Sequence, residues 1–157
     1  TADQLPVAWR EAANCGCAVF AEQWIHGAEY SASMLAGEVL PLIRIDADSS
    51  FYDYEAKYFS DRTRYVCPCE LPADQERQLG QLASAAFDAL GASGWGRVDL
   101  MLDEQGTPLI LEVNTVPGMT SHSLVPLAAA QAGIEFDELV WRILETSLTE
   151  AGHGSAA

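Results

Sequence analysis

The chain has 157 residues, 49% of them hydrophobic, and its 23 Asp and Glu residues against 8 Lys and Arg residues give a formal net charge of −15. This is enough apolar material for the core of one domain, and the acidic balance argues against a basic surface that binds nucleic acid. No apolar run reaches the ~20 residues of a membrane-spanning helix and the first residues lack the basic-then-apolar order of a signal peptide, so we expect a cytoplasmic protein without a membrane partner.

The first predicted elements are a helix over residues 5–13 and three short strands. Apolar runs at residues 18–25, 29–36 and 39–45 are separated by two-residue turns. This spacing predicts an antiparallel meander. Pro41 has no backbone N–H to donate, and we therefore expect it at an edge or a bulged position.

Residues 46–69 form a long segment that is rich in aromatic and polar residues and has little apolar periodicity. Loops of this length without regular structure are usually functional or disordered. Lys57 is the only lysine of the chain and is followed by Tyr58. A lysine in this setting indicates a site, and a solvated loop lysine is the alternative.

The four cysteines occur as two pairs, Cys15 with Cys17 and Cys67 with Cys69. Zinc ligands usually have a spacer of two or more residues, whereas each pair here has a spacer of one. We therefore favour reduced thiols over a structural zinc site, and in a reducing compartment no disulfide is expected.

Three helices are predicted in the second half of the chain, over residues 71–90, 123–132 and 136–148. Their apolar residues recur at helical spacing, and we expect the first helix to pack on the sheet. Residues 151–157 lack apolar side chains to bury, which predicts a disordered tail after one domain over residues 1–150.

Between the first two of these helices, two apolar runs over residues 94–103 and 108–114 are joined by a short polar loop that contains Gly106. Glycine at this position permits a positive φ, and the pattern predicts an antiparallel hairpin. The hairpin carries polar residues at alternate positions of its strands.

Alternation places Arg97 and Asp99 on one face of the first strand, and Glu112 and Asn114 on one face of the second. Carboxylate and amide oxygens are hard donors that suit Mg²⁺ or Mn²⁺, with further ligands from phosphate and water. The alternative is an exposed hairpin face whose charges are solvated.

Three separated motifs closely resemble those of a known family. Residues 51–58 read Phe-Tyr-Asp-Tyr-Glu-Ala-Lys-Tyr, residues 94–99 read Gly-Trp-Gly-Arg-Val-Asp, and residues 112–126 read Glu-Val-Asn-Thr-Val-Pro-Gly-Met-Thr-Ser-His-Ser-Leu-Val-Pro. They resemble the D-alanine–D-alanine ligases, which are ATP-grasp enzymes. The resemblance implies an α+β ATP-grasp C-terminal domain, with an antiparallel sheet covered by helices. The N-terminal domain and glycine-rich loop of that family are absent ahead of Thr1, so we expect the C-terminal part of a longer ligase.

The resemblance also implies roles for residues that bind the nucleotide and close the site. Glu22, Trp24 and Ile25 correspond to the adenine pocket, and Glu29 to the acceptor of the ribose hydroxyls. The alternative is that Glu22 and Glu29 are ordinary solvated charges beside the first turn. Lys57 corresponds to a residue that reaches the transferred phosphate. Tyr58 corresponds to a residue that closes the loop over the second substrate, where tyrosine goes with D-alanine and phenylalanine goes with D-lactate.

The remaining candidates suit the chemistry of the reaction that the resemblance implies. Asp99, Glu112 and Asn114 can hold two Mg²⁺ ions, or Mn²⁺, against the ATP phosphates. Arg97 and the backbone N–H of Gly118 can stabilise a tetrahedral oxyanion. Ser123 and Leu124 lie at a helix start that suits a substrate carboxylate, whereas a plain N-cap is the other interpretation of Ser123.

The implied reaction joins two D-alanines through an acyl phosphate, at the expense of ATP, for peptidoglycan synthesis. The implied partners are D-alanine, ATP, the N-terminal half of the ligase and, in the complete enzyme, a second copy in a homodimer. Two alternatives stay open: another ATP-grasp carboxylate–amine ligase, and an inactive nucleotide-binding fragment.

Overall fold

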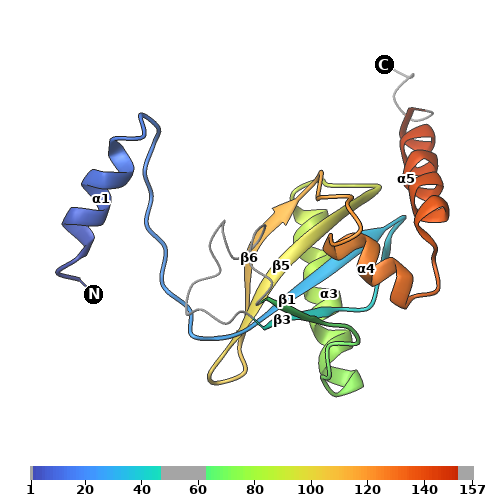
Figure 1. Ribbon diagram of the computed structural model, residues 1–157, viewed down its shortest axis with the longest axis horizontal. Helices are drawn as coiled ribbons and strands as arrows, with labels where there is room; N and C mark the ends of the chain where they lie inside the picture. Colours follow the sequence, from blue (N-terminus) through green and yellow to red (C-terminus); the bar gives the residue numbers. More distant parts are fainter. Residues whose placement is uncertain (1, 47–62, 152–157) are drawn as a thin grey trace.

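The computed structural model describes residues 2–46 and 63–151 of the chain (Figure 1). The predicted tail after residue 151 and the segment that holds Lys57 and Tyr58 lie outside these ranges. The elements follow one another as α1 (Leu5–Ala13), β1 (Gly27–Leu35), β2 (Glu38–Val39), β3 (Ile43–Asp46), β4 (Arg64–Val66), α3 (Ala73–Ala89), β5 (Trp95–Asp103), β6 (Pro108–Asn114), α4 (Leu124–Gln131) and α5 (Phe136–Ala151).

The strands form one antiparallel sheet in the order β4-β3-β1-β5-β6, and β2 pairs with part of β1. The predicted hairpin is confirmed as β5 and β6. Its turn is closed by a bond of 3.0 Å from the Asp103 N–H to the Thr107 carbonyl, and Gly106 has a φ of +79°. The two longest strands, β1 and β5, pair along their whole length, from Gly27 opposite Asp103 to Leu35 opposite Trp95.

The predicted first strand over residues 18–25 is wrong, because this segment has no strand structure. Its expected partner, β1, pairs with β5 on one side and with β2 and β3 on the other. Neither side of β1 is therefore open to a further strand. The predicted strand over residues 39–45 is interrupted around Pro41, which lies between β2 and β3, as expected for a residue without a backbone donor.

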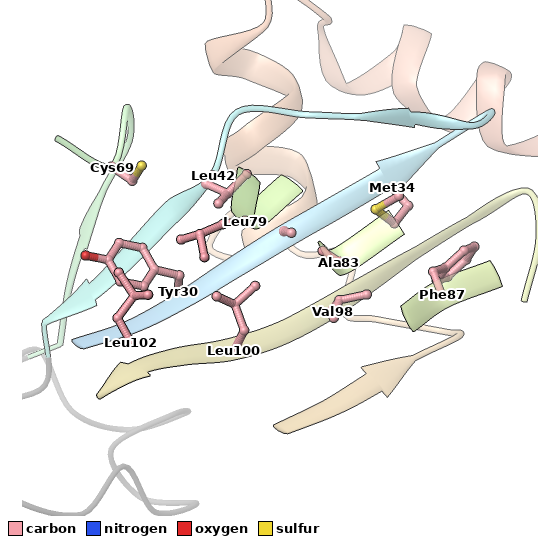
Figure 2. Packing of buried hydrophobic residues seen from close by; sticks show 11 residues of the cluster. Tyr30, Met34, Leu42, Cys69, Leu79, Ala83, Phe87, Val98, Leu100 and Leu102 are labelled. Carbon is pink, nitrogen blue, oxygen red and sulfur yellow. The ribbon is translucent and has the colours of Figure 1, made fainter. Parts of the chain in front are cut away.

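Helix α3 covers one face of the sheet and contributes apolar side chains at helical spacing, which confirms the predicted packing (Figure 2). The shared cluster takes alternate residues from β1 and β5, because successive side chains of a strand point to opposite faces. Its buried members are Tyr30, Ala32, Met34, Leu42, Cys69, Leu79, Ala83, Phe87, Val98, Leu100 and Leu102.

Helices α4 and α5 contribute to a second cluster on the other face. It includes Leu35, Ile43 and Ile45 of the sheet, with Val125 and Leu139 from the two helices. Because this cluster occupies only part of its face, the remaining part of β1, β5 and β6 carries the polar residues of the hairpin.

A β-bulge in β6 decides which of its side chains reach the polar face. Leu100 pairs with Ile110 but Asp99 pairs with Glu112, so Leu111 is an extra residue in the ladder. Ile110 packs with the α3 cluster. Without the bulge, Glu112 would share the face of Ile110, since the two are two residues apart.

Helix α1 has no buried residues, and an extended segment separates it from β1 (Figure 1). Leu5, Val7 and Trp9 leave about half of their surface exposed, at 51%, 49% and 45%. Among the described helices, none has both the length and the apolar character that a membrane span requires.

Candidate functional site

The central strands bring the polar residues of the hairpin together on one face of the sheet. Asp99 of β5 pairs with Glu112 of β6, and Arg97 pairs with Asn114. On its other side, Asp99 pairs with Ser31 of β1. The three strands therefore place these five side chains on the face away from α3.

Arg97 and Asp99 form a forked ion pair in this cluster. Arg97 Nε donates to Asp99 Oδ1 at 2.9 Å, and Arg97 Nη2 donates to Asp99 Oδ2 at 2.7 Å. Both residues are buried, with 6% and 5% of their surface exposed. A pair with two parallel hydrogen bonds holds the carboxylate in one orientation and offsets the cost of its burial.

Two further side chains complete the surroundings of the Asp99 carboxylate. Ser31 Oγ donates to Oδ1 at 2.9 Å, and Asn114 Nδ2 donates to Oδ2 at 3.2 Å. Asn114 Nδ2 also donates to Glu112 Oε1 at 3.1 Å, so this amide bridges the two carboxylates. The Glu112 side chain is 55% exposed, and its Oε1 lies 3.9 Å from Arg97 Nη2. The cluster thus has a buried end at Asp99 and an open end at Glu112.

The donor set fits a hard divalent cation that takes its other ligands from phosphate and water. Two carboxylates outweigh the single guanidinium, so the cluster carries a negative charge that a cation would offset. Within the described ranges, no group of three or more His, Cys, Asp or Glu side chains is placed to hold a metal. A site with few protein ligands is typical of Mg²⁺ bound together with a nucleotide.

The loop before α4 places Ser123 and Gly118 in contact. Ser123 Oγ accepts from the Thr120 N–H at 3.0 Å and makes no side-chain cap bond to α4, although Ser123 occupies the N-cap position. A Cβ on Gly118 would lie 2.9 Å from this oxygen, so glycine permits the close approach. The Leu124 side chain is buried in the second apolar cluster. The part of Leu124 that can meet a substrate carboxylate is therefore its backbone N–H, at the start of α4, and not its side chain.

The structure does not gather all of the residues that were assigned to the nucleotide. Glu29 lies on β1 two residues before Ser31, hence on the same face as the cluster. Glu22, Trp24 and Ile25 lie on the extended segment before β1, where Glu22 is exposed and Trp24 is 51% exposed. Trp24 makes an edge contact with His26, with ring centroids 6.2 Å apart.

Sequence reasoning missed Ser31, although it bonds the central carboxylate of the cluster. The available signal was the alternation of polar Ser31 and Ser33 with apolar neighbours along β1. This pattern gains a meaning only once β1 is known to pair with β5, because Ser31 and Asp99 are 68 positions apart.

Solved structures share this arrangement of strands and helices. A D-alanine–D-alanine ligase from Bacillus anthracis matches with a TM-score of 0.70 and 41% identity, over 82% of this chain and 41% of that chain. The structure of the Bacillus anthracis ligase complexed with ATP matches with a TM-score of 0.69 and 37% identity, over 82% and 40%. The fold is the predicted α+β fold of the ATP-grasp C-terminal domain.

A family model described as the D-ala D-ala ligase C-terminus matches residues 1–145, and the chain belongs to this family. D-alanine–D-alanine ligase of Methylococcus capsulatus is 58% identical over 94% of this chain, and that of Nitrosococcus oceani is 60% identical over 93%. The chain spans about half the length of these curated relatives, 48% and 46%.

Proposed function

We propose that this chain is the nucleotide- and metal-binding part of a ligase that joins two D-alanines at the expense of ATP. The observation that carries the proposal is the cluster of Arg97, Asp99, Glu112 and Asn114 on one face of the hairpin. The relatives that are named D-alanine–D-alanine ligases, and the ATP-bound structure among the neighbours, support the same reaction. The proposed domain covers residues 1–150.

In this proposal Asp99, Glu112 and Asn114 hold two Mg²⁺ ions, or Mn²⁺. When bound, such ions neutralise the charge of the nucleotide phosphates during phosphoryl transfer. The bridging Asn114 amide keeps the two carboxylates at a fixed separation, and Arg97 fixes the orientation of Asp99. The protein thus supplies a preorganised anionic surface before the nucleotide arrives.

The proposed reaction has two steps. The carboxylate of the first D-alanine attacks the γ-phosphorus of ATP, which forms an acyl phosphate and releases ADP. The amine of the second D-alanine then attacks the acyl carbon, so that a C–N bond forms, inorganic phosphate leaves and the nitrogen loses a proton. The backbone N–H of Gly118 and the Arg97 guanidinium stabilise the tetrahedral oxygen between these events. The start of α4, at Ser123 and Leu124, binds the carboxylate of the second substrate.

Other roles are proposed from the resemblance alone. Glu22, Trp24 and Ile25 contact adenine, and Glu29 accepts from the ribose hydroxyls. Lys57 contacts the transferred phosphate.

Tyr58 belongs to the same set of proposals and selects D-alanine as the second substrate. We also propose that the complete enzyme includes an N-terminal half, forms a homodimer and works in the cytoplasm, where ATP is available.

The test is a product assay on the complete ligase that carries this chain and, separately, on the chain itself. With D-alanine, ATP and Mg²⁺, the complete ligase is expected to release ADP and D-alanyl-D-alanine, which mass spectrometry identifies. D-Serine and D-lactate, offered as competing second substrates, test the choice of nucleophile, because one structural neighbour is a D-Ala:D-Ser ligase of Enterococcus faecalis. A different dominant product contradicts the proposed substrate. The chain alone is expected to form no dipeptide above background, and clear turnover by it contradicts the proposed need for the N-terminal half.

A further inference from the structure

Two buried serines of β1 differ in what their hydroxyls contact. Ser31 and Ser33 both have 0% exposure, and they lie two residues apart on the same face of one strand. Ser31 Oγ donates to Asp99 Oδ1 at 2.9 Å. Ser33 Oγ is the buried side-chain oxygen in the described residues that has no hydrogen-bond partner. The same residue type thus occupies two comparable positions, with and without a contact to the cluster.

The Ser31 hydroxyl acts on one particular oxygen of Asp99. Oδ1 receives hydrogen bonds from Ser31 and from Arg97 Nε, each at 2.9 Å. Oδ2 accepts from Arg97 Nη2 at 2.7 Å and faces Asn114, whose amide also reaches Glu112. The hydroxyl therefore engages the oxygen on the β1 side of the carboxylate, while Oδ2, which Arg97 also holds, is directed toward the other two candidate ligands.

The backbone fixes this contact. Ser31 pairs directly with Asp99 in the β1–β5 ladder, which runs without a register shift from Gly27 opposite Asp103 to Leu35 opposite Trp95. Side chains of directly opposed residues lie close enough to interact across a strand pair. The short serine side chain also loses little conformational freedom when it is held in one orientation.

From these contacts we infer that Ser31 is a positioning residue for the cation site and acts through Asp99. It holds Oδ1 so that Oδ2 is presented together with Glu112 and Asn114. The inference rests on the proposed function, because it assigns Ser31 to the cation site of that reaction. Groups that orient a metal ligand without touching the metal change metal affinity by about tenfold to a hundredfold when they are removed.

The experiment compares Ser31→Ala, Ser31→Thr and Ser33→Ala in the complete ligase. Mn²⁺ binding to the protein in the presence of ATP is measured as the decrease in the electron paramagnetic resonance signal of free Mn²⁺ below that of a sample with ATP alone. The Mg²⁺ concentration for half-maximal turnover and the thermal midpoint are measured in parallel. Ser31→Ala is expected to weaken Mn²⁺ binding and to raise the Mg²⁺ requirement by about tenfold. Ser31→Thr, which keeps the hydroxyl, and Ser33→Ala, which removes a hydroxyl without a partner, are expected to stay within about twofold of the parent.

The outcomes separate the inference from the proposed function. If the parent binds Mn²⁺ but Ser31→Ala and Ser33→Ala are indistinguishable in metal dependence, Ser31 has no positioning role, whatever their thermal midpoints are. If the parent itself binds no Mn²⁺ with ATP, the proposed cation site is wrong and the inference falls with it. Should Ser31→Ala not fold, Ser31→Cys makes the same comparison, since the thiol is nearly isosteric and a much weaker donor.

Discussion

The two faces of β1 and β5 are both buried, yet they are built on different principles. On the α3 face, Val98 and Leu100 are fully buried among other apolar side chains. On the opposite face, their chain neighbours Arg97 and Asp99 are almost as deeply buried but are held by directed hydrogen bonds. Burial alone therefore does not distinguish the core from the candidate site.

The difference lies in what each face loses when a side chain is truncated. An apolar side chain contributes in proportion to the surface that it removes from water, and its loss leaves a cavity. A buried charged side chain contributes little net stability while it is paired, but its loss leaves its partner uncompensated. Substitutions on the α3 face should therefore change stability alone, whereas substitutions at the buried end of the polar face should change both stability and catalysis.

The largest effect is expected at the buried end of the cluster. Asp99→Ala in the complete ligase should lower turnover by about a thousandfold, because it removes a proposed cation ligand and releases Arg97 from its fixed orientation. It should also lower the free energy of unfolding by ~3–5 kcal/mol, since the guanidinium stays buried without its partner. Steady-state kinetics and chemical denaturation measure the two effects. Asp88→Ala, at an exposed position of α3, is the control and should change neither.

Leu100→Ala, one residue further along β5, tests the apolar face. It should lower the free energy of unfolding by about 3 kcal/mol, through lost burial and a residual cavity beside Val98. The Mg²⁺ concentration for half-maximal turnover should stay that of the parent at temperatures where the variant is folded. A large shift in metal dependence would show that the two faces are not separable in this way.

Glu112→Gln tests the open end of the cluster. The side chain keeps its shape but loses its charge, so the Mg²⁺ requirement should rise and turnover should fall by roughly a hundredfold. Because the Glu112 side chain is 55% exposed, the free energy of unfolding should change by less than about 0.5 kcal/mol. Unchanged metal dependence and rate would remove Glu112 from the proposed site.

The smallest effect concerns two cysteines, each of which contacts a different one of the two apolar clusters. Cys69 belongs to the α3 cluster and Cys67 packs against the other cluster. Burial raises the pKa of both thiols, to about 11 for Cys67. Since the thiolate is the reactive form, Cys67 and Cys69 should alkylate slowly near neutral pH, whereas the exposed Cys15 and Cys17 react readily.

Mass spectrometry after iodoacetamide treatment at increasing pH measures these rates. The rate at Cys67 should increase with pH up to about 11. The folded protein favours the protonated form of the Cys67 thiol, because its pKa is higher there than in the unfolded chain. The contribution of Cys67 to the free energy of unfolding is therefore complete below the unfolded pKa of 9.0 and decreases as the pH rises from there toward about 11. Equal rates at all four cysteines near neutral pH would contradict the burial of Cys67 and Cys69.

Local pattern was sufficient to predict the hairpin, its turn at Gly106 and the helices around it. The polar face of the hairpin was also predictable, because alternation within one strand places Arg97 with Asp99 without knowledge of any distant contact. These features depend on residues that are close in sequence, and the structure confirms them.

Features that depend on distant partners were not predictable from pattern. The apolar residues 18–25 resemble a strand, but whether they form one depends on a free edge of β1, which β5 occupies from the far half of the chain. The Ser31 contact depends on the same pairing. The bulge at Leu111 could not be predicted, because Ile110 and Glu112 are two positions apart in the sequence whether or not the residue between them is paired in the ladder.

The bulge at Leu111 limits how the length of β6 can change during evolution or engineering. Deletion of Leu111 itself would make Ile110 and Glu112 consecutive residues, and regular alternation would keep them on opposite faces, as the bulge does now. Deletion of a regularly paired residue such as Val113 would instead turn the residues on one side of it to the other face. Substitutions in β6 are therefore local in effect. A single-residue insertion or deletion in its regularly paired part exchanges the two faces beyond that point, whereas the bulge is the position at which the strand can lose a residue without this exchange. Crossover points for chimeric ligases belong in the turn over residues 103–107, where most of the chain is exposed and an exchange leaves the pairing of β6 with β5 unchanged.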